Sequence, residues 1–152
     1  MDLLQFIAHL GGATTRMDAA RHAALERSAK LVEAEAKRLI GDYQDAAGPF
    51  PPWADLADRT KDERTRLGFP EDEPGLRTGE MRDSISHRVE RAEAVVGSNN
   101  DKMVYFELGT VKQPPRSVLG GALVRNEEHV ARILGEAAVA ALIGSGANLR
   151  LR

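Results

Sequence analysis

The sequence contains no cysteine, few aromatic residues and no large excess of charge of either sign. Without cysteine there is no disulfide framework, no thiolate nucleophile and no cysteine-based metal site, so any assembly has to be non-covalent. The formal net charge is -2 and the sequence pI is near 6.1, which argues against a protein that mainly neutralises DNA phosphates. No apolar run approaches the roughly 18 residues that a membrane span requires, so we expect no membrane partner.

Patterns that carry catalysis are also missing from the sequence. There is no Gly-x-Ser-x-Gly elbow, no Gly-Lys-Thr or Gly-Lys-Ser phosphate loop, and no pair of histidines at metal-binding spacing. The acidic run at residues 71–73 lacks the alternating ligands, the glycine and the distal glutamate of a calcium loop. His87 has no ligand partner at matching spacing, which favours a hydrogen-bonded structural role. We therefore predict a chain that is not an enzyme and binds no metal or cofactor.

The composition is that of one ordinary globular domain. The chain has 152 residues, of which 42% are hydrophobic and 29% are charged, enough to bury a real core. We predict a single α+β domain over residues 1–143, in which a long N-terminal helix and a C-terminal helix pack on a small antiparallel sheet. Residues 144–152 are predicted to be a flexible basic tail.

Helical periodicity dominates the first forty residues. We expect a short amphipathic helix over residues 1–10, a break at Gly11 and Gly12, and a second helix from about Met17 to Ile40. The stripe on the second helix serves either as a seam for a partner or as the face that packs on the chain's own sheet. Its members are Leu25, Ser28, Leu31, Val32, Ala36 and Leu39.

The middle of the chain alternates short elements with proline-rich connections. A rigid connector over residues 48–53 leads to Trp53, whose proline and acidic neighbours favour packing in a core or interface over stacking on a base. A short charged helix is expected over residues 54–67, with Leu56 and Ala57 facing inward, and one helical turn over residues 78–82.

Two further elements follow in the second half. Alternating residues predict an antiparallel hairpin over residues 85–97. A helix is expected from about Ala122 to Ile143, ended by Gly144. The apolar stripe of this helix would comprise Leu123, Val130, Leu134, Ala137 and Ala141.

The segment over residues 105–116, which we name the junction, is expected to be a docking loop between the hairpin and the last helix. Gly109 permits a positive φ, and Pro114 with Pro115 forms an extended strut. Glu107 and Arg116 would either pair across the loop or each contact a neighbouring subunit. The candidate interface residues are Tyr105, Glu107, Gly109, Thr110, Pro114, Pro115 and Arg116.

The order of several motifs resembles a known family. Leu76-Arg77-Thr78-Gly79-Glu80-Met81-Arg82-Asp83-Ser84-Ile85 is followed by the strand end Val95-Val96-Gly97, then by Tyr105-Phe106-Glu107-Leu108-Gly109-Thr110, then by Pro114-Pro115-Arg116. In that order they resemble the tail-component, or head–tail joining, proteins of long-tailed double-stranded DNA bacteriophages, over roughly residues 53–143. The chain departs from the family pattern in three places. Met81 replaces the usual leucine, Leu108 replaces the phenylalanine, and Arg116-Ser117-Val118-Leu119 replaces arginine-proline-phenylalanine-leucine.

The resemblance implies a structural protein of the virion neck or tail-completion region. Such a protein would form a ring, with six-fold symmetry to match a tail tube, between the portal-side connector or stopper proteins and the tail terminator or tail tube. It would be made in the host cytoplasm, and it would contact passing DNA without sequence preference.

Two other functions stay open from the residues. A nucleic-acid-binding module would need one basic face, built from Arg59, Lys61, Arg64 and Arg66, or from Arg150 and Arg152. A small hydrolase would need two carboxylates that converge in a pocket.

Overall fold

The computed structural model describes residues 2–143, and the predicted tail at 144–152 lies outside them. Within the described residues the chain has a mixed α+β fold, which confirms the predicted class. None of the described helices is both long and apolar enough to cross a membrane. In chain order the elements are α1 (Leu3–Leu39), α2 (Asp58–Arg66), α3 (Glu80–Asp83), β1 (Ile85–Glu90), β2 (Glu93–Ser98), α4 (Asp101–Leu108) and α5 (Leu119–Ile143).

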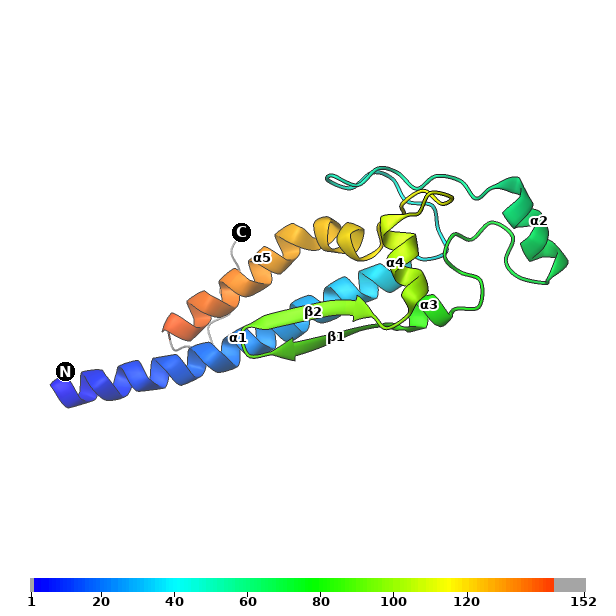
Figure 1. Cartoon of the computed structure of the whole chain (residues 1–152). Helices are drawn as coiled ribbons and strands as arrows, with labels where there is room; N and C mark the ends of the chain where they lie inside the picture. Colours follow the sequence, from blue (N-terminus) through cyan, green and yellow to red (C-terminus); the bar gives the residue numbers. More distant parts are fainter. Residues whose placement is uncertain (1, 144–152) are drawn as a thin grey trace.

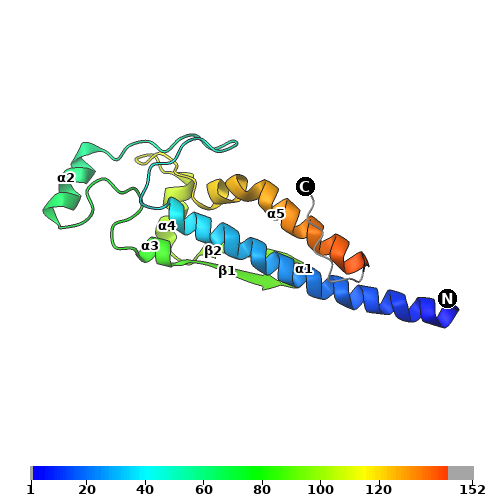
Figure 2. The ribbon, with the colours of Figure 1, turned by 180° about the vertical axis from the view of Figure 1, so that it is seen from behind.

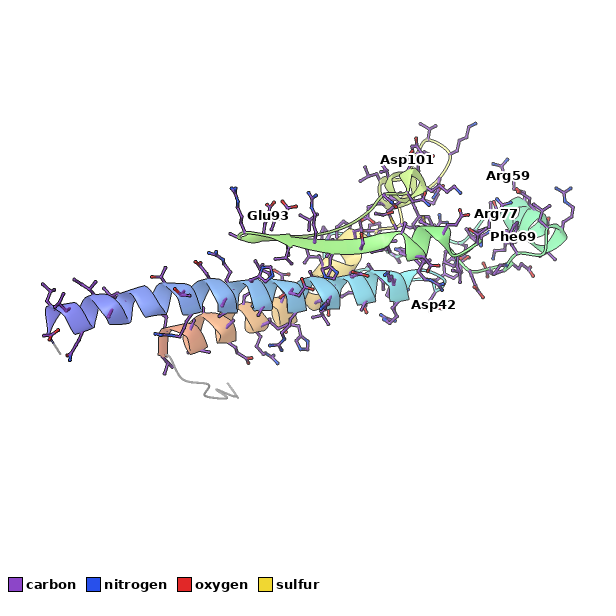
Figure 3. All side chains as sticks on the ribbon, turned by 90° about the horizontal axis from the view of Figure 1, so that it is seen from below. Asp42, Arg59, Phe69, Arg77, Glu93 and Asp101 are labelled. Carbon is purple, nitrogen blue, oxygen red and sulfur yellow. The ribbon has the colours of Figure 1, made fainter. Side chains whose placement is uncertain are left out.

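Helix α1 is the central element of the fold. The hairpin of β1 and β2 covers one side of α1 and α5 runs along the opposite side, as Figure 3 shows. The two strands are antiparallel and pair from Ile85 with Ser98 to Glu90 with Glu93, as the sequence predicts. The first turns of α1 extend beyond both α5 and the hairpin (Figures 1 and 2). Helices α2, α3 and α4 gather at the other end of the molecule.

The hydrophobic core lies where the second half of α1 meets the start of α5, the hairpin and α4. Trp53 belongs to this core, and its ring meets Phe106 edge-on with 5.4 Å between the centroids, so the prediction that it packs inside is confirmed. Small residues allow α5 to approach α1 closely. The buried members of the core are Val32, Ala36, Leu39, Ile40, Trp53, Met81, Ile85, Met103, Phe106, Val118 and Ala122.

The predicted break at Gly11 and Gly12 is wrong, because α1 continues through both glycines. Glycine inside a helix costs about 1 kcal/mol relative to alanine, which is too little to end a helix with good helix formers on both sides. The side chains of the two threonines after the glycines donate to carbonyls one turn earlier in the same helix, Thr14 to Leu10 and Thr15 to Gly11. The start is a capping box between Asp2 and Gln5.

The buried stripes of both long helices differ from the predicted ones by a few positions. On α1, Ala24 and Ala29 are buried, whereas Leu25 and Leu31 are only partly covered. On α5, Leu123 is exposed, and Ala122 and Ile133 are buried instead. The close approach of the two helices explains the difference, since it places small residues at the contact and leaves larger ones at its edges.

The side chain of His87 links the hairpin to α1 by hydrogen bonds. Its Nδ1 is hydrogen-bonded to Glu33 and its Nε2 lies 3.2 Å from Glu26 Oε1, so β1 is tied to two positions of α1 that are two helical turns apart. These bonds raise the pKa of His87, mainly through Glu33 and then Glu26. The predicted structural role of this histidine is confirmed.

Candidate functional site

The junction is half helix and half loop. Residues 105–108 were expected in a loop but belong to α4, and this correction has a local cause. The Asn100 side chain accepts a hydrogen bond from Lys102 N, which caps the helix, and Asp101 supplies a negative charge in its first turn. The helix then ends at Gly109, whose φ is 75°.

Both the backbone angle and the neighbouring atoms exclude a side chain at position 109. A Cβ atom at this position would lie 2.7 Å from Pro115 N and 2.9 Å from Gln113 O, which is closer than any side chain tolerates. Thr110 and Gln113 then pair in a small bridge that returns the chain to Pro114. The predicted positive φ is therefore confirmed, and the loop is held tightly against the end of α4.

Glu107 caps α5. Its Oε1 accepts hydrogen bonds from Ser117 Oγ at 2.6 Å and from Gly120 N at 2.9 Å, and its Oε2 accepts from Val118 N at 2.6 Å and Leu119 N at 2.9 Å. Three of the unpaired N–H groups that every helix start leaves are satisfied by one carboxylate. The negative charge also faces the positive end of the helix dipole. This cap explains why α5 begins at Leu119 and not at the predicted Ala122.

Arg116 is buried, with only 3% of its surface exposed. Its Nε and Nη2 donate to the carbonyl of Ala54 at 3.0 and 2.7 Å, Nη2 also donates to Asp55 at 3.1 Å, and the guanidinium lies over the Phe106 ring. The carbonyls of Ala54 and Asp55 accept hydrogen bonds from Arg116 instead of from the backbone of a helix, so α2 begins at Asp58 rather than at Ala54. Ala57, which was expected to face inward, is exposed.

Glu107 and Arg116 do not pair with each other, so that alternative is wrong. Each has hydrogen-bond partners inside the fold, so both side chains stabilise the chain itself. The remaining candidates lie on the outside: Tyr105, Thr110, Pro114 and Pro115 are exposed. The candidate site therefore has an internal frame, made by Glu107, Gly109 and Arg116, and an outer surface.

The outer surface contains apolar residues that the sequence analysis did not select. Four large apolar side chains within eight residues are exposed, and Val111 is fully so. Val104 and Leu108 are one helical turn apart, and this spacing was the available signal for an apolar face on α4. We name this surface the α4 patch; it comprises Val104, Tyr105, Leu108 and Val111.

A second exposed apolar surface lies at the other end of the molecule. The first turns of α1 carry Leu3, Leu4, Ile7 and Leu10, all at least half exposed, and we name residues 3–16 the α1 arm. Their spacing places them along one broad side of the helix. The arm projects past every neighbouring element (Figures 1 and 2), so no part of the described chain covers it.

A cleft of about 900 Å³ separates the α4 end of the junction from α2 and the segment before it. Two carboxylates line it, Asp55 and Glu80, and no hydrogen bond joins them in the described part of the chain; Glu80 lies 3.8 Å from Lys102 Nζ. Among residues 2–143, no group of three histidine, cysteine or acidic side chains could hold a metal ion. The prediction that the chain is not an enzyme stays a prediction.

The basic residues of α2 do not form one exposed face. Arg64 is buried, Lys61 pairs with Asp72 at 2.9 Å, and only Arg59 and Arg66 of the set remain exposed. The first set of basic residues that a nucleic-acid-binding module would need, on α2, therefore does not form one face. The second set, Arg150 and Arg152, lies outside the described residues.

Comparisons with protein-family models, with curated proteins and with solved structures found no match for this chain.

Proposed function

We propose that this chain is a structural protein of a bacteriophage virion. It assembles into a ring in the neck or tail-completion region and joins the portal-side connector to the tail tube. The viral part of the proposal is supported by the ordered motifs between Leu76 and Arg116. The assembly part is supported by the positions of the exposed apolar side chains.

The observation that carries the proposal is the presence of two different unpartnered apolar surfaces at opposite ends of the molecule. The α1 arm is at one end and the α4 patch is at the other (Figure 1). Large exposed apolar surfaces mark sites of protein association. Two unlike surfaces on one chain suit heterologous, head-to-tail contacts, and such contacts generate rings when the rotation between subunits closes.

The internal frame of the junction fits the same role. Glu107, Gly109 and Arg116 fix the loop that carries Val111 and the prolines, so the α4 patch is presented on a rigid support. A preorganised surface loses less conformational entropy on binding than a mobile loop does. In a ring the same contact is repeated around the circle, so contacts of modest strength add up to a stable collar.

The proposal is tested by the molar mass of the purified chain in solution. Light scattering after size exclusion is measured over a concentration series, with and without the tail-tube and connector proteins of a long-tailed phage, and large species are imaged by electron microscopy. The proposal predicts a closed ring in at least one of these conditions. A chain that remains monomeric in all of them would contradict it.

A further inference from the structure

The cleft beside the junction is strongly basic. Six of its lining side chains are lysine or arginine and two are acidic, so the lining carries a net charge of about +4 within a protein whose formal net charge is -2. Arg59, Phe69 and Arg77 mark the α2 side of this end of the molecule in Figure 3. The basic side chains are Arg59, Arg64, Arg77, Lys102, Lys112 and Arg116.

Two of these arginines are buried without a carboxylate partner. Arg64 is 8% exposed and donates from Nη1 to the carbonyls of Glu73 at 2.7 Å and Pro70 at 3.3 Å, and Arg116 likewise bonds only to carbonyls. Arg64 Nε and Nη2 and Arg116 Nη1 donate to no acceptor in residues 2–143. The one fully enclosed side-chain polar atom without a partner there is Ser28 Oγ, so these nitrogens retain access to solvent.

The electrostatic environment of these guanidinium groups is unfavourable as it stands. Burial lowers the pKa of Arg64, and the nearby charge of Arg77 lowers it further; the charges of Asp72 and Glu73 oppose this shift without reversing it. Burial likewise lowers the pKa of Arg116, to which Arg64 adds repulsion. Buried charges in proteins are normally paired, and a guanidinium binds a carboxylate through two parallel hydrogen bonds. An anion in the cleft would supply the missing counter-charge.

We infer that the cleft binds an acidic peptide segment of a different protein, with one carboxylate placed between Arg64 and Arg116. Exposed Arg59 and Lys112 at the rim would pair with further acidic residues, and Phe69 and Tyr105 would contact apolar ones. A recessed pair of arginines suits an inserted side chain better than the phosphates of a duplex, which need basic groups that project.

A second copy of this chain is a poor source of such a segment. The only run of three acidic residues is at 71–73, and although its side chains are exposed, two contacts tie the run to its own chain. The Asp72 carboxylate binds the Tyr43 hydroxyl at 2.5 Å and Lys61 at 2.9 Å, and the Glu73 carbonyl binds Arg64. The partner is therefore a neighbouring protein, and in this respect the inference rests on the proposed function.

The test measures the fluorescence anisotropy of labelled probes with the full chain at low ionic strength. The first probe is a fluorescein-labelled hexapeptide of alternating glutamate and leucine; the second replaces every glutamate with glutamine; the third is a labelled 12-nucleotide oligothymidylate. The variant is Arg59→Gln/Lys112→Gln, because neither side chain makes an ion pair or hydrogen bond within residues 2–143, so the fold does not depend on them. The matched control is Arg27→Gln/Arg132→Gln, which removes the same charge from exposed sites outside the cleft.

We expect the acidic peptide to bind at least about tenfold more tightly than its glutamine counterpart, and the cleft variant to lose about five- to tenfold in affinity while the control retains it. Equal binding of both peptides, or equal loss in both variants, would overturn the inference. Tighter binding of the oligonucleotide would overturn it in favour of a nucleic-acid site. The binding assay uses the isolated chain, so its result is separate from the test of assembly. If the chain forms a ring but does not bind the acidic peptide, only this inference fails. If the chain binds the peptide but never forms a ring, only the proposed assembly fails.

Discussion

Replacing Glu107 with alanine is expected to destabilise the fold substantially although the side chain is only partly buried. The substitution removes four hydrogen bonds at the start of α5 and leaves Val118, Leu119 and Gly120 with unpaired N–H groups. Loss of a good helix cap costs up to about 2 kcal/mol. Loss of an anion at the positive end of the helix dipole costs about 1 kcal/mol more.

The sum is a decrease of about 3 kcal/mol in the free energy of unfolding, or about 6–12 °C in Tm for a chain of this size. Glu107→Gln should lower the free energy of unfolding less than Glu107→Ala does. Its amide oxygen can still accept two of the four hydrogen bonds, although the negative charge is lost. Urea unfolding can be followed by the fluorescence of Trp53, the only tryptophan, which is buried against Phe106.

The matched control for this prediction is Glu128→Ala. Glu128 is exposed on α5 and makes no ion pair within residues 2–143, so its removal should change the free energy of unfolding by less than about 0.5 kcal/mol. If Glu107→Ala and Glu128→Ala were equally stable, the capping role of Glu107 would be refuted.

Three further predictions concern the junction frame and the hairpin. Arg116→Ala should lower the free energy of unfolding by about 2–3 kcal/mol in urea titrations, because it removes three hydrogen bonds of a buried cation. Gly109→Ala should cost at least about 1–3 kcal/mol in the same assay, since its Cβ would collide with Pro115 N at 2.7 Å. The ion pairs of His87 should make stability decline as pH rises above about 6.5, and His87→Gln should remove that decline in urea titrations between pH 5 and 9.

The sign of the pH effect follows from the direction of the shift. The pKa of His87 is raised in the folded state, so its contribution is complete below the pKa of the unfolded chain and is lost as pH rises through the folded value. The pKa of Glu33 is lowered, mainly by His87 and then by Lys37. The contribution of Glu33 to stability is therefore lost only as the pH falls into the acid range. His129→Gln, on the exposed side of α5, is the control and should keep the alkaline decline.

Each of the other two predictions has its own contrary outcome. An Arg116→Ala chain as stable as the unsubstituted one would return Arg116 to the purely intermolecular role that the sequence suggested. A Gly109→Ala chain of normal stability would show that the loop between Thr110 and Pro115 adapts, and the α4 patch would then lack its rigid support.

Local patterns predicted the hairpin and the last helix, but they missed α4. Alternation of side chains along residues 85–97 identified the hairpin, because a strand's faces are set by neighbours two residues apart. Gly109 was identified because a glycine can adopt a positive φ without the steric cost that a Cβ atom would add. The two glycines of α1 were misjudged, since their effect depends on the helix formers around them rather than on the glycines themselves.

The internal frame of the junction could not be predicted in the same way. Arg116 reaches carbonyls that are 61 and 62 residues earlier in the chain, and His87 reaches Glu33 across 54 residues. Pairs at such separations depend on how α1, the hairpin and the connector pack, which no local spacing encodes. Glu107 and the start of α5 are only 10–13 residues apart, but a loop that reverses direction lies between them.

In the proposed ring the exposed apolar surfaces hold copies of this chain together, and substitutions in the α1 arm test this contact. Leu4→Gln/Ile7→Gln removes two exposed apolar side chains from the arm, and His22→Gln/Arg27→Gln is a control on the same helix outside the arm. Molar mass by light scattering is compared for the three chains, at equal concentration and with the same tail-tube and connector proteins. We expect a ring for the unsubstituted and control chains and a monomer for the arm variant. An arm variant that assembles as well as the unsubstituted chain would contradict this expectation.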